Sequence, residues 1–356
     1  MPSKTAKKRG PRFREVSSKT NWKNIQSKNK IKRKTKLGVV VLGLLVLMLL
    51  LSQAVKFTKT LFSPWQISNS VKNYTWDGKF NINFLLRSKT ISLVSYNPSD
   101  QKVEVIDIPD NTYIEAAHGY GKWQVRSIYD LGQSQSGLGG NRLLKDSLQD
   151  LFAQPIDGFL DFSGVYPNLS GKEIIEKFRS DFFGPFNILH GLKTDLTLWE
   201  LIKLKFGLAS VRFDNVILID LQEINVLSVD YLLDGSEVLI ADPAQLDLAL
   251  VDLADPKIKS ERKTIALFNA SEKPLFAQKW ARLISNMGGD VIITANSQNT
   301  LDKSLVTGER SDTLLRLQQI FNSSCSSSEC DKIQKEDEDL SSSRSQINLK
   351  LGLDLN

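Results

Sequence analysis

The stretch FNINFLLRSKTISLVSYNPSDQKVEVIDIP, residues 80–109, decides the fold of this chain. It contains three short runs rich in apolar and β-branched residues, at 80–86, 90–96 and 102–108. The second and third runs are separated by Asn-Pro-Ser-Asp, a sequence that favours a tight turn. The pattern therefore predicts three consecutive strands, the last two of which form a hairpin.

The third run, KVEVIDI, has a mixed apolar pattern. Val103 and Val105 point to one face of a strand, whereas Ile106 and Ile108 point to the other. A β-bulge near Val105 would restore a single apolar face. Burial of both faces of the strand is the other possibility, and the sequence leaves both open.

Upstream, residues 37–55 read LGVVVLGLLVLMLLLSQAV and contain no ionisable side chain. As a helix this run would be about 28 Å long, close to the ~30 Å hydrocarbon core of a bilayer. Because a backbone in lipid must satisfy its own hydrogen bonds, the run predicts one transmembrane helix. A cleaved signal peptide normally has a shorter apolar region and a clearer cleavage site, so an uncleaved anchor is favoured.

The first 36 residues carry fourteen basic side chains and one acidic one, a net charge of +13. The whole chain carries +6, so the rest sums to −7. Basic flanks of membrane helices stay in the cytoplasm, which places the tail inside and the later residues outside the cell membrane. The tail is predicted to be disordered, and without a folded DNA-reading element we expect no nucleic-acid partner. Residues 56–77 are predicted to form a stalk.

Helical and strand patterns alternate downstream, which predicts an extracytoplasmic α/β domain over residues 78–255. The helical patterns cover 125–131, 141–151, 171–182 and 197–206, with Asn141 as the expected N-cap of the second. The strand patterns are 155–160 and VILIDL at 216–221, the latter predicted to be buried.

The charged segment DPKIKSE, 255–261, is predicted to link this domain to a smaller α/β domain over 262–356. The pattern at the start of this smaller domain predicts a parallel strand–helix–strand unit, with elements at 264–268, 273–287 and 291–294. A helix at 313–321 and a strand at 347–351 follow, on either side of a polar insert, 322–343.

The insert holds the two cysteines of the sequence, Cys325 and Cys330. Outside the cell a disulfide between them is permitted and would close a small loop. Free thiols are the alternative. Two thiols without a nearby histidine are too few ligands for a metal ion, so no metal site is expected.

Several short motifs, in their order along the chain, resemble the LytR-CpsA-Psr (LCP) family of envelope proteins. RSKT at 87–90 and IPDNTY at 108–113 resemble the family's Arg-Ser-Asp-Thr and Ile-Pro-Arg-Asp-Thr-Tyr. IYDLG at 128–132 and PID at 155–157 stand where the family has a tyrosine-containing helix and a Pro-Ile-Asp strand. LFNA at 267–270 and LGLD at 351–354 resemble the LytR C-terminal domain that often follows.

The resemblance implies a single N-terminal transmembrane helix, an LCP-like α/β/α domain and a smaller C-terminal α/β domain. It also implies transfer of a glycopolymer from a polyprenyl-pyrophosphate carrier to peptidoglycan. That chemistry uses arginines against the pyrophosphate and carboxylates that hold Mg²⁺. The implied partners are the membrane, envelope glycopolymer, polyprenyl lipid and peptidoglycan.

The charges of the phosphate site depart from the family's pattern. Lys89 stands at a carboxylate position, and Asp110 stands where the family has arginine, so a charge that binds phosphate is replaced by one that repels it. The family's later arginine-rich segment has no counterpart. We therefore predict a non-catalytic binding or scaffolding relative without a cofactor. The alternative is an active phosphotransferase, which would need Mg²⁺.

No catalytic residue is assigned. The sequence has two histidines and neither a Gly-x-Ser-x-Gly nor a phosphate-loop motif, which leaves little material for a histidine-based triad. For the alternative, we expect a phosphate or polyprenyl head group to be contacted by Arg87, Lys89, Lys122, Arg126 and Arg142. That alternative requires the cations to converge on one pocket.

Overall fold

The computed structural model describes Met48 and residues 74–180, 191–323 and 337–355. The basic tail, most of the predicted stalk and all of the predicted membrane helix except Met48 lie outside this part of the chain, and so do Cys325 and Cys330. Among the described residues, no helix is both long and apolar enough to cross a bilayer.

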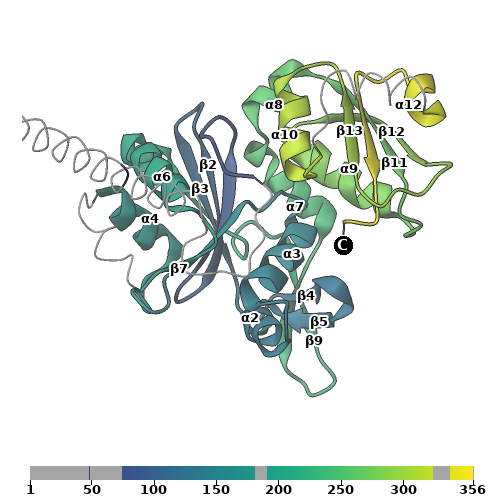
Figure 1. Ribbon diagram of the computed structural model, residues 1–356. Helices are drawn as coiled ribbons and strands as arrows, with labels where there is room; N and C mark the ends of the chain where they lie inside the picture. Colours follow the sequence, from purple (N-terminus) through teal and green to yellow (C-terminus); the bar gives the residue numbers. More distant parts are fainter. Residues whose placement is uncertain (1–47, 49–73, 181–190, 324–336, 356) are drawn as a thin grey trace, which may run out of the picture. The chain divides into compact units, whose positions relative to one another are not determined.

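A six-stranded mixed sheet, in the order β7-β6-β1-β2-β3-β8, forms the centre of the fold (Figure 1). Its three middle strands are the three predicted ones, β1 (Ile82–Arg87), β2 (Ile91–Asn97) and β3 (Lys102–Ile108), which pair antiparallel. On one side β6 (Gly158–Asp161) pairs parallel with β1, and β7 (Lys193–Thr194) pairs with β6. On the other side β8 (Val216–Asp220) pairs parallel with β3.

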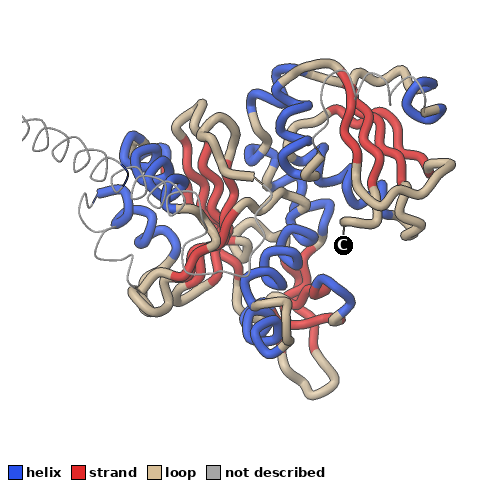
Figure 2. The backbone as a smooth tube through the Cα atoms, in the orientation of Figure 1, coloured by secondary structure: helices blue, strands red, loops and turns tan. Residues whose placement is uncertain are grey.

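Helices cover both faces of this sheet, which gives three α/β/α layers (Figures 1 and 2). On one face lie α4 (Gly171–Ser180) and α6 (Leu198–Ser210); on the other lie α2 (Val125–Ser134), α3 (Gly140–Phe152) and α7 (Pro243–Ala249). The mixed α/β class predicted from the sequence is confirmed.

The structure decides the open question about β3. The β2–β3 register runs without a bulge, and both faces of β3 are buried. Val103 and Val105 belong to the core under α4 and α6, while Ile106 and Ile108 belong to the core under α2 and α3. The mixed apolar pattern is that of a strand between two helical layers.

Two local predictions were wrong. VILIDL forms β8, but it is an edge strand rather than a buried one, with Ile217 37% and Leu218 43% exposed. Asn141 does not cap α3; the N-cap is Gly139, with φ 85°. Glycine adopts this positive-φ conformation at little cost, so the chain turns into the helix at Gly139. Asn141 lies inside the first turn.

The predicted charged linker is a short helix, α8 (Pro256–Glu261). Asp255 caps it by accepting a hydrogen bond from the Lys257 N–H and also accepts one from the Asn81 N–H at 2.7 Å. Both Asp255 and Ile258 are buried. Asp followed by Pro is a typical helix start. The many charged residues of this segment instead favoured the prediction of a linker.

The C-terminal part contains a four-stranded sheet in the order β12-β11-β14-β13. The predicted strand–helix–strand unit is confirmed as β11 (Thr264–Asn269), α9 (Phe276–Asn286) and β12 (Asp290–Asn296), with parallel strands. The later elements are β13 (Leu305–Gly308), α10 (Asp312–Ile320), α12 (Glu338–Ser342) and β14 (Ile347–Leu351). Residues of α9 and α10 pack on one face of the sheet.

The remaining elements of the described residues are two small hairpins and three short 3-10 helices. They are β4 (Tyr113–Ala116) with β5 (Gly121–Gln124), β9 (Leu227–Tyr231) with β10 (Glu237–Ala241), η1 (Ala117–Gly119), η2 (Phe213–Asn215) and η3 (Val251–Leu253).

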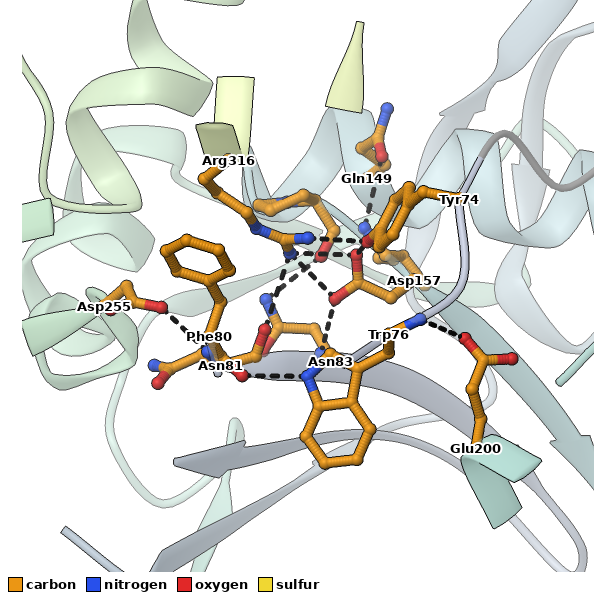
Figure 3. A network of polar contacts seen from close by, with 12 residues as sticks. Tyr74, Trp76, Phe80, Asn81, Asn83, Gln149, Asp157, Glu200, Asp255 and Arg316 are labelled. Carbon is orange, nitrogen blue, oxygen red and sulfur yellow. Dashed lines mark hydrogen bonds and ion pairs between the residues drawn. The ribbon is translucent and has the colours of Figure 1, made fainter. Parts of the chain in front are cut away.

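A buried ion pair joins the C-terminal part to the central sheet (Figure 3). The Arg316 guanidinium, on α10, donates to both carboxylate oxygens of Asp157, just before β6, at 2.9 and 3.1 Å. Both side chains are at most 3% exposed. The Asn83 N–H donates to the same carboxylate at 3.0 Å, so the pair is anchored to the start of β1.

Residues at the end of the predicted stalk complete this network. The Tyr74 hydroxyl donates to Asp157 and accepts from Arg316, and the buried Trp76 indole donates to the Phe80 carbonyl at 2.9 Å. The Trp76 N–H donates to Glu200 of α6 at 2.6 Å. Residues 74–77 are therefore part of the folded unit.

Arg316→Ala should lower the free energy of unfolding by about 3–5 kcal/mol, because it removes one partner of a buried, hydrogen-bonded ion pair. Urea unfolding of the full chain measures this difference. The matched control is Arg310→Ala at an exposed position, expected to change stability by less than about 0.5 kcal/mol. Equal losses in the two variants would contradict the assigned role of the ion pair.

Candidate functional site

The carboxyl-end edge of the central sheet is the place where a ligand site is expected. Strands β1, β3, β6 and β8 run in one direction, so their carboxyl ends meet at one edge. Arg87, Asp161 and Asp220 end β1, β6 and β8, and Asp107 is the penultimate residue of β3. Open α/β sheets bind ligands outside this edge.

Arg87 is already paired within the protein. Its Nη1 donates to Asp161 Oδ2 at 3.0 Å and to Ser163 Oγ at 3.1 Å. The guanidinium lies 4.1 Å from the centre of the Tyr129 ring. Because Asp161 is only 3% exposed, its carboxylate depends on this arginine for charge compensation. The positive charge of Arg87 is therefore neutralised before any ligand arrives.

Tyr129, on α2, forms the wall beside this pair. Its ring stacks on Phe159 of β6 with centroids 5.7 Å apart. Burial raises the pKa of Tyr129 and the Asp161 carboxylate raises it further, while Arg87 opposes the shift. The phenol therefore stays protonated, as a neutral neighbour of the Arg87–Asp161 pair.

A second acidic group lies where β2, β3 and β8 meet. The Ser92 hydroxyl donates to Asp107 Oδ1 at 2.6 Å. Burial raises the pKa of Asp107, the Ser92 hydrogen bond opposes this, and the Asp220 carboxylate adds to the rise. The first residue of α4, Gly171, approaches so closely that a Cβ there would lie 2.3 Å from Ser92 Oγ. Only glycine allows this approach.

The five predicted cations come from different places in the fold: β1, the β1–β2 turn, β5, α2 and α3. Lys89 is exposed in the turn between β1 and β2, Lys122 is exposed on β5, and Arg126 is exposed at the start of α2. Arg142, on α3, lies 3.7 Å from Asp146, which also contacts His118 at 2.8 Å. In the described part of the chain no hydrogen bond or ion pair joins two of them through a common partner. Their predicted roles stay predictions.

The sequence analysis missed the acids of this edge. Asp161, Asp107 and Asp220 each stand at or near the end of a strand pattern, and that position was the available signal. Which carboxylates lie beside Arg87 depends on how the strands pair, and a local sequence pattern does not show that pairing.

The carboxylates of this edge do not form a complete Mg²⁺ site by themselves. Among the described residues, no three His, Cys, Asp or Glu side chains are arranged to hold a metal ion. Asp107 and Asp220 are two carboxylates that interact electrostatically. Mg²⁺ bound by one or two carboxylates takes its other ligands from water and substrate phosphates, so these two would hold it only together with a ligand.

Comparison with known proteins gave no matching family model and no matching curated protein. Solved structures do match. Bacillus subtilis TagT is 16% identical, with a TM-score of 0.36 over 55% of this chain and 97% of its own. B. subtilis TagV is 12% identical, with a TM-score of 0.38 over 49% of this chain and 95% of its own.

A third solved structure that matches is a LytR-CPS2A-psr family protein, YwtF (TagT), with bound octaprenyl pyrophosphate lipid. It is 16% identical, with a TM-score of 0.36 over 54% of this chain and 95% of its own. At these identities and scores the matches carry no argument about the chemistry of this chain.

Asp107→Asn should become more stable than the wild type as the pH rises from about 4 to about 7. The raised pKa of Asp107 means that the folded protein holds this proton more tightly than the unfolded chain. The carboxyl therefore costs stability once the pH exceeds its unfolded pKa of about 3.9. The asparagine keeps an acceptor for Ser92 and removes that cost.

Urea unfolding of both proteins across this pH range measures the effect. The control is Asp110→Asn, the same substitution at an exposed position in the turn after β3. A pH-independent difference for Asp107→Asn would contradict the prediction.

Proposed function

We propose that this chain is a membrane-anchored cell-envelope protein of the LytR-CpsA-Psr type that binds or scaffolds glycopolymer rather than transfers it. Residues 37–55 are the anchor and the basic residues 1–36 lie in the cytoplasm. The described α/β fold then lies outside the membrane. Its partners are envelope glycopolymer, polyprenyl lipid or peptidoglycan.

The observation that carries the proposal is the neutralised Arg87. Transfer from a polyprenyl pyrophosphate requires cations that are free to compensate the phosphate charges. Here the arginine at the carboxyl-end edge already pairs with Asp161, and the other strand ends contribute Asp107 and Asp220. The four strand ends therefore present three carboxylates and one guanidinium.

An active phosphotransferase is the second candidate, and one observation favours it. Asp107 and Asp220 lie close enough for the Asp220 carboxylate to raise the pKa of Asp107. A cation between two such carboxylates would relieve their repulsion. In that case these residues would hold Mg²⁺, which would supply charge compensation for the phosphates.

A transfer assay separates the two candidates. The full chain in lipid vesicles receives a polyprenyl-pyrophosphate-linked glycopolymer and peptidoglycan, with and without Mg²⁺. We expect binding of the glycopolymer or peptidoglycan without covalent transfer. Mg²⁺-dependent transfer that Asp107→Asn abolishes would overturn the proposal and establish the second candidate.

Topology is tested separately on intact cells that produce the chain. A protease added outside should digest residues 74–355, while the basic tail stays protected. Complete protection of the folded part, together with its recovery in the cytosol, would refute the envelope location.

Arg87→Ala should lower the free energy of unfolding by about 1–3 kcal/mol, because it leaves the buried Asp161 carboxylate without its cation. Binding to sedimented peptidoglycan should be unchanged at temperatures where the variant stays folded. The control is Arg310→Ala, the same substitution at an exposed position, which should alter neither quantity. Wild-type stability combined with lost binding in Arg87→Ala would instead mean that Arg87 contacts the ligand.

A further inference from the structure

A pocket of about 280 Å³ opens at the opposite edge of the central sheet, where β1 and β3 begin. The floor of the pocket is polar and comes from the β2–β3 hairpin: Ser95, Asn97, Asp100, Lys102 and Glu104. Asn81, before β1, also lines the pocket. The opposite wall comes from η3, α8 and the residues between them. Its apolar members are Val251, Ala254 and Pro256, and its charged members are Asp252 and Lys259.

The floor of this pocket is polar at a place where the sheet otherwise buries apolar side chains. On the same face, the neighbouring cross-strand pair is Leu93 and Ile106, both fully buried. The next pair along that face is Ser95 and Glu104, each only 4% exposed. Burial of polar groups is costly unless they are hydrogen-bonded, so packing alone does not account for this pair.

The polar groups of the floor keep unused hydrogen-bonding capacity. Glu104 Oε1 pairs with Lys102 Nζ at 2.5 Å, and the described residues offer no partner to its second oxygen. The Ser95 hydroxyl likewise makes no side-chain hydrogen bond within the described part of the chain. Asn81 Nδ2 donates to the carbonyls of residues 253 and 254, which leaves the Asn81 Oδ1 acceptor available.

The pocket lining carries the acids Asp100, Glu104 and Asp252 and the bases Lys102 and Lys259. Lys102 Nζ contacts Glu104 and also Asp252, at 3.5 Å. Burial alone would lower the pKa of Lys102, but hydrogen bonding and attraction to Glu104 raise it. Lys102 therefore stays charged and neutralises Glu104. With three acids and two bases in the lining, an anionic ligand is disfavoured. A neutral ligand suits the pocket if it donates to Glu104 and Asn81 and accepts from Ser95 or Lys102.

We propose that this pocket binds a neutral polyhydroxylated molecule, a saccharide of one or two rings. A hydroxyl both donates and accepts, which matches a floor that presents both kinds of group side by side. The volume is near the lower end of small-ligand pockets, about 300–1,000 Å³, which suits a ligand of this size. Val251 and Pro256 give the C–H surface of a ring an apolar contact.

The site is separate from the carboxyl-end edge, so the inference goes beyond the proposed function and does not depend on it. The test uses the full chain in a detergent without a sugar head group, since a glycoside detergent would compete. The probes are D-glucose, N-acetyl-D-glucosamine and maltose. The comparisons that carry formal charges are L-alanine, a zwitterion, and inorganic phosphate, an anion. Saturation-transfer NMR and the ligand-dependent shift in melting temperature report binding.

We expect at least one of the sugars to bind and neither charged probe to do so. Ser95→Ala should weaken sugar binding about five- to tenfold, the loss of one hydrogen bond, and should leave the unliganded melting temperature unchanged. Glu104→Gln should also weaken binding. The matched control is Ser228→Ala on the exposed strand β9, which should bind as the wild type does.

Failure of all three sugars to bind would overturn the proposal. Equal binding by Ser95→Ala and Ser228→Ala would overturn it as well, because the sugar would then occupy another place. Binding of L-alanine or phosphate that Ser95→Ala weakens would show that the pocket takes a charged ligand instead.

Discussion

The buried Arg316–Asp157 ion pair is the interaction on which the rest of the structure depends (Figure 3). Asp157 receives hydrogen bonds from the start of β1 and from Tyr74, while Arg316 comes from α10, far along the chain. A charge buried this deeply is tolerable only with its partner in place. The central sheet and the C-terminal part therefore stabilise each other, although the sequence resembles two successive domains.

The two edges of the central sheet differ in their chemistry. At the carboxyl-end edge, Arg87 pairs with the Asp161 carboxylate. The Asp107 and Asp220 carboxylates at the same edge would repel a phosphate. At the opposite edge, Ser95 and Glu104 are buried with hydrogen-bonding capacity to spare. Internal neutralisation argues against group transfer at the first edge, and unsatisfied polarity argues for recognition of a neutral ligand at the second.

Much of the fold could be predicted because its signals are local. The strands β1 to β3 and the β11–α9–β12 unit follow from apolar patterns within a few residues of one another. The edge position of β8 could not be predicted, since burial depends on which strand lies beside it. The acidic partner of Arg87 was missed for a similar reason, since Asp161 is 74 positions away along the chain. The Asp157–Arg316 ion pair joins residues that are 159 positions apart. No local pattern reports such partners.

Strand β8 is the last strand of its sheet among those described, and it carries the partly exposed Ile217 and Leu218. Its outer side presents backbone N–H and C=O groups to which a further strand can add. A polypeptide in extended conformation would gain main-chain hydrogen bonds there and cover both apolar side chains at once. Strand addition at β8 would serve self-association at high protein concentration as well as binding of a different protein chain.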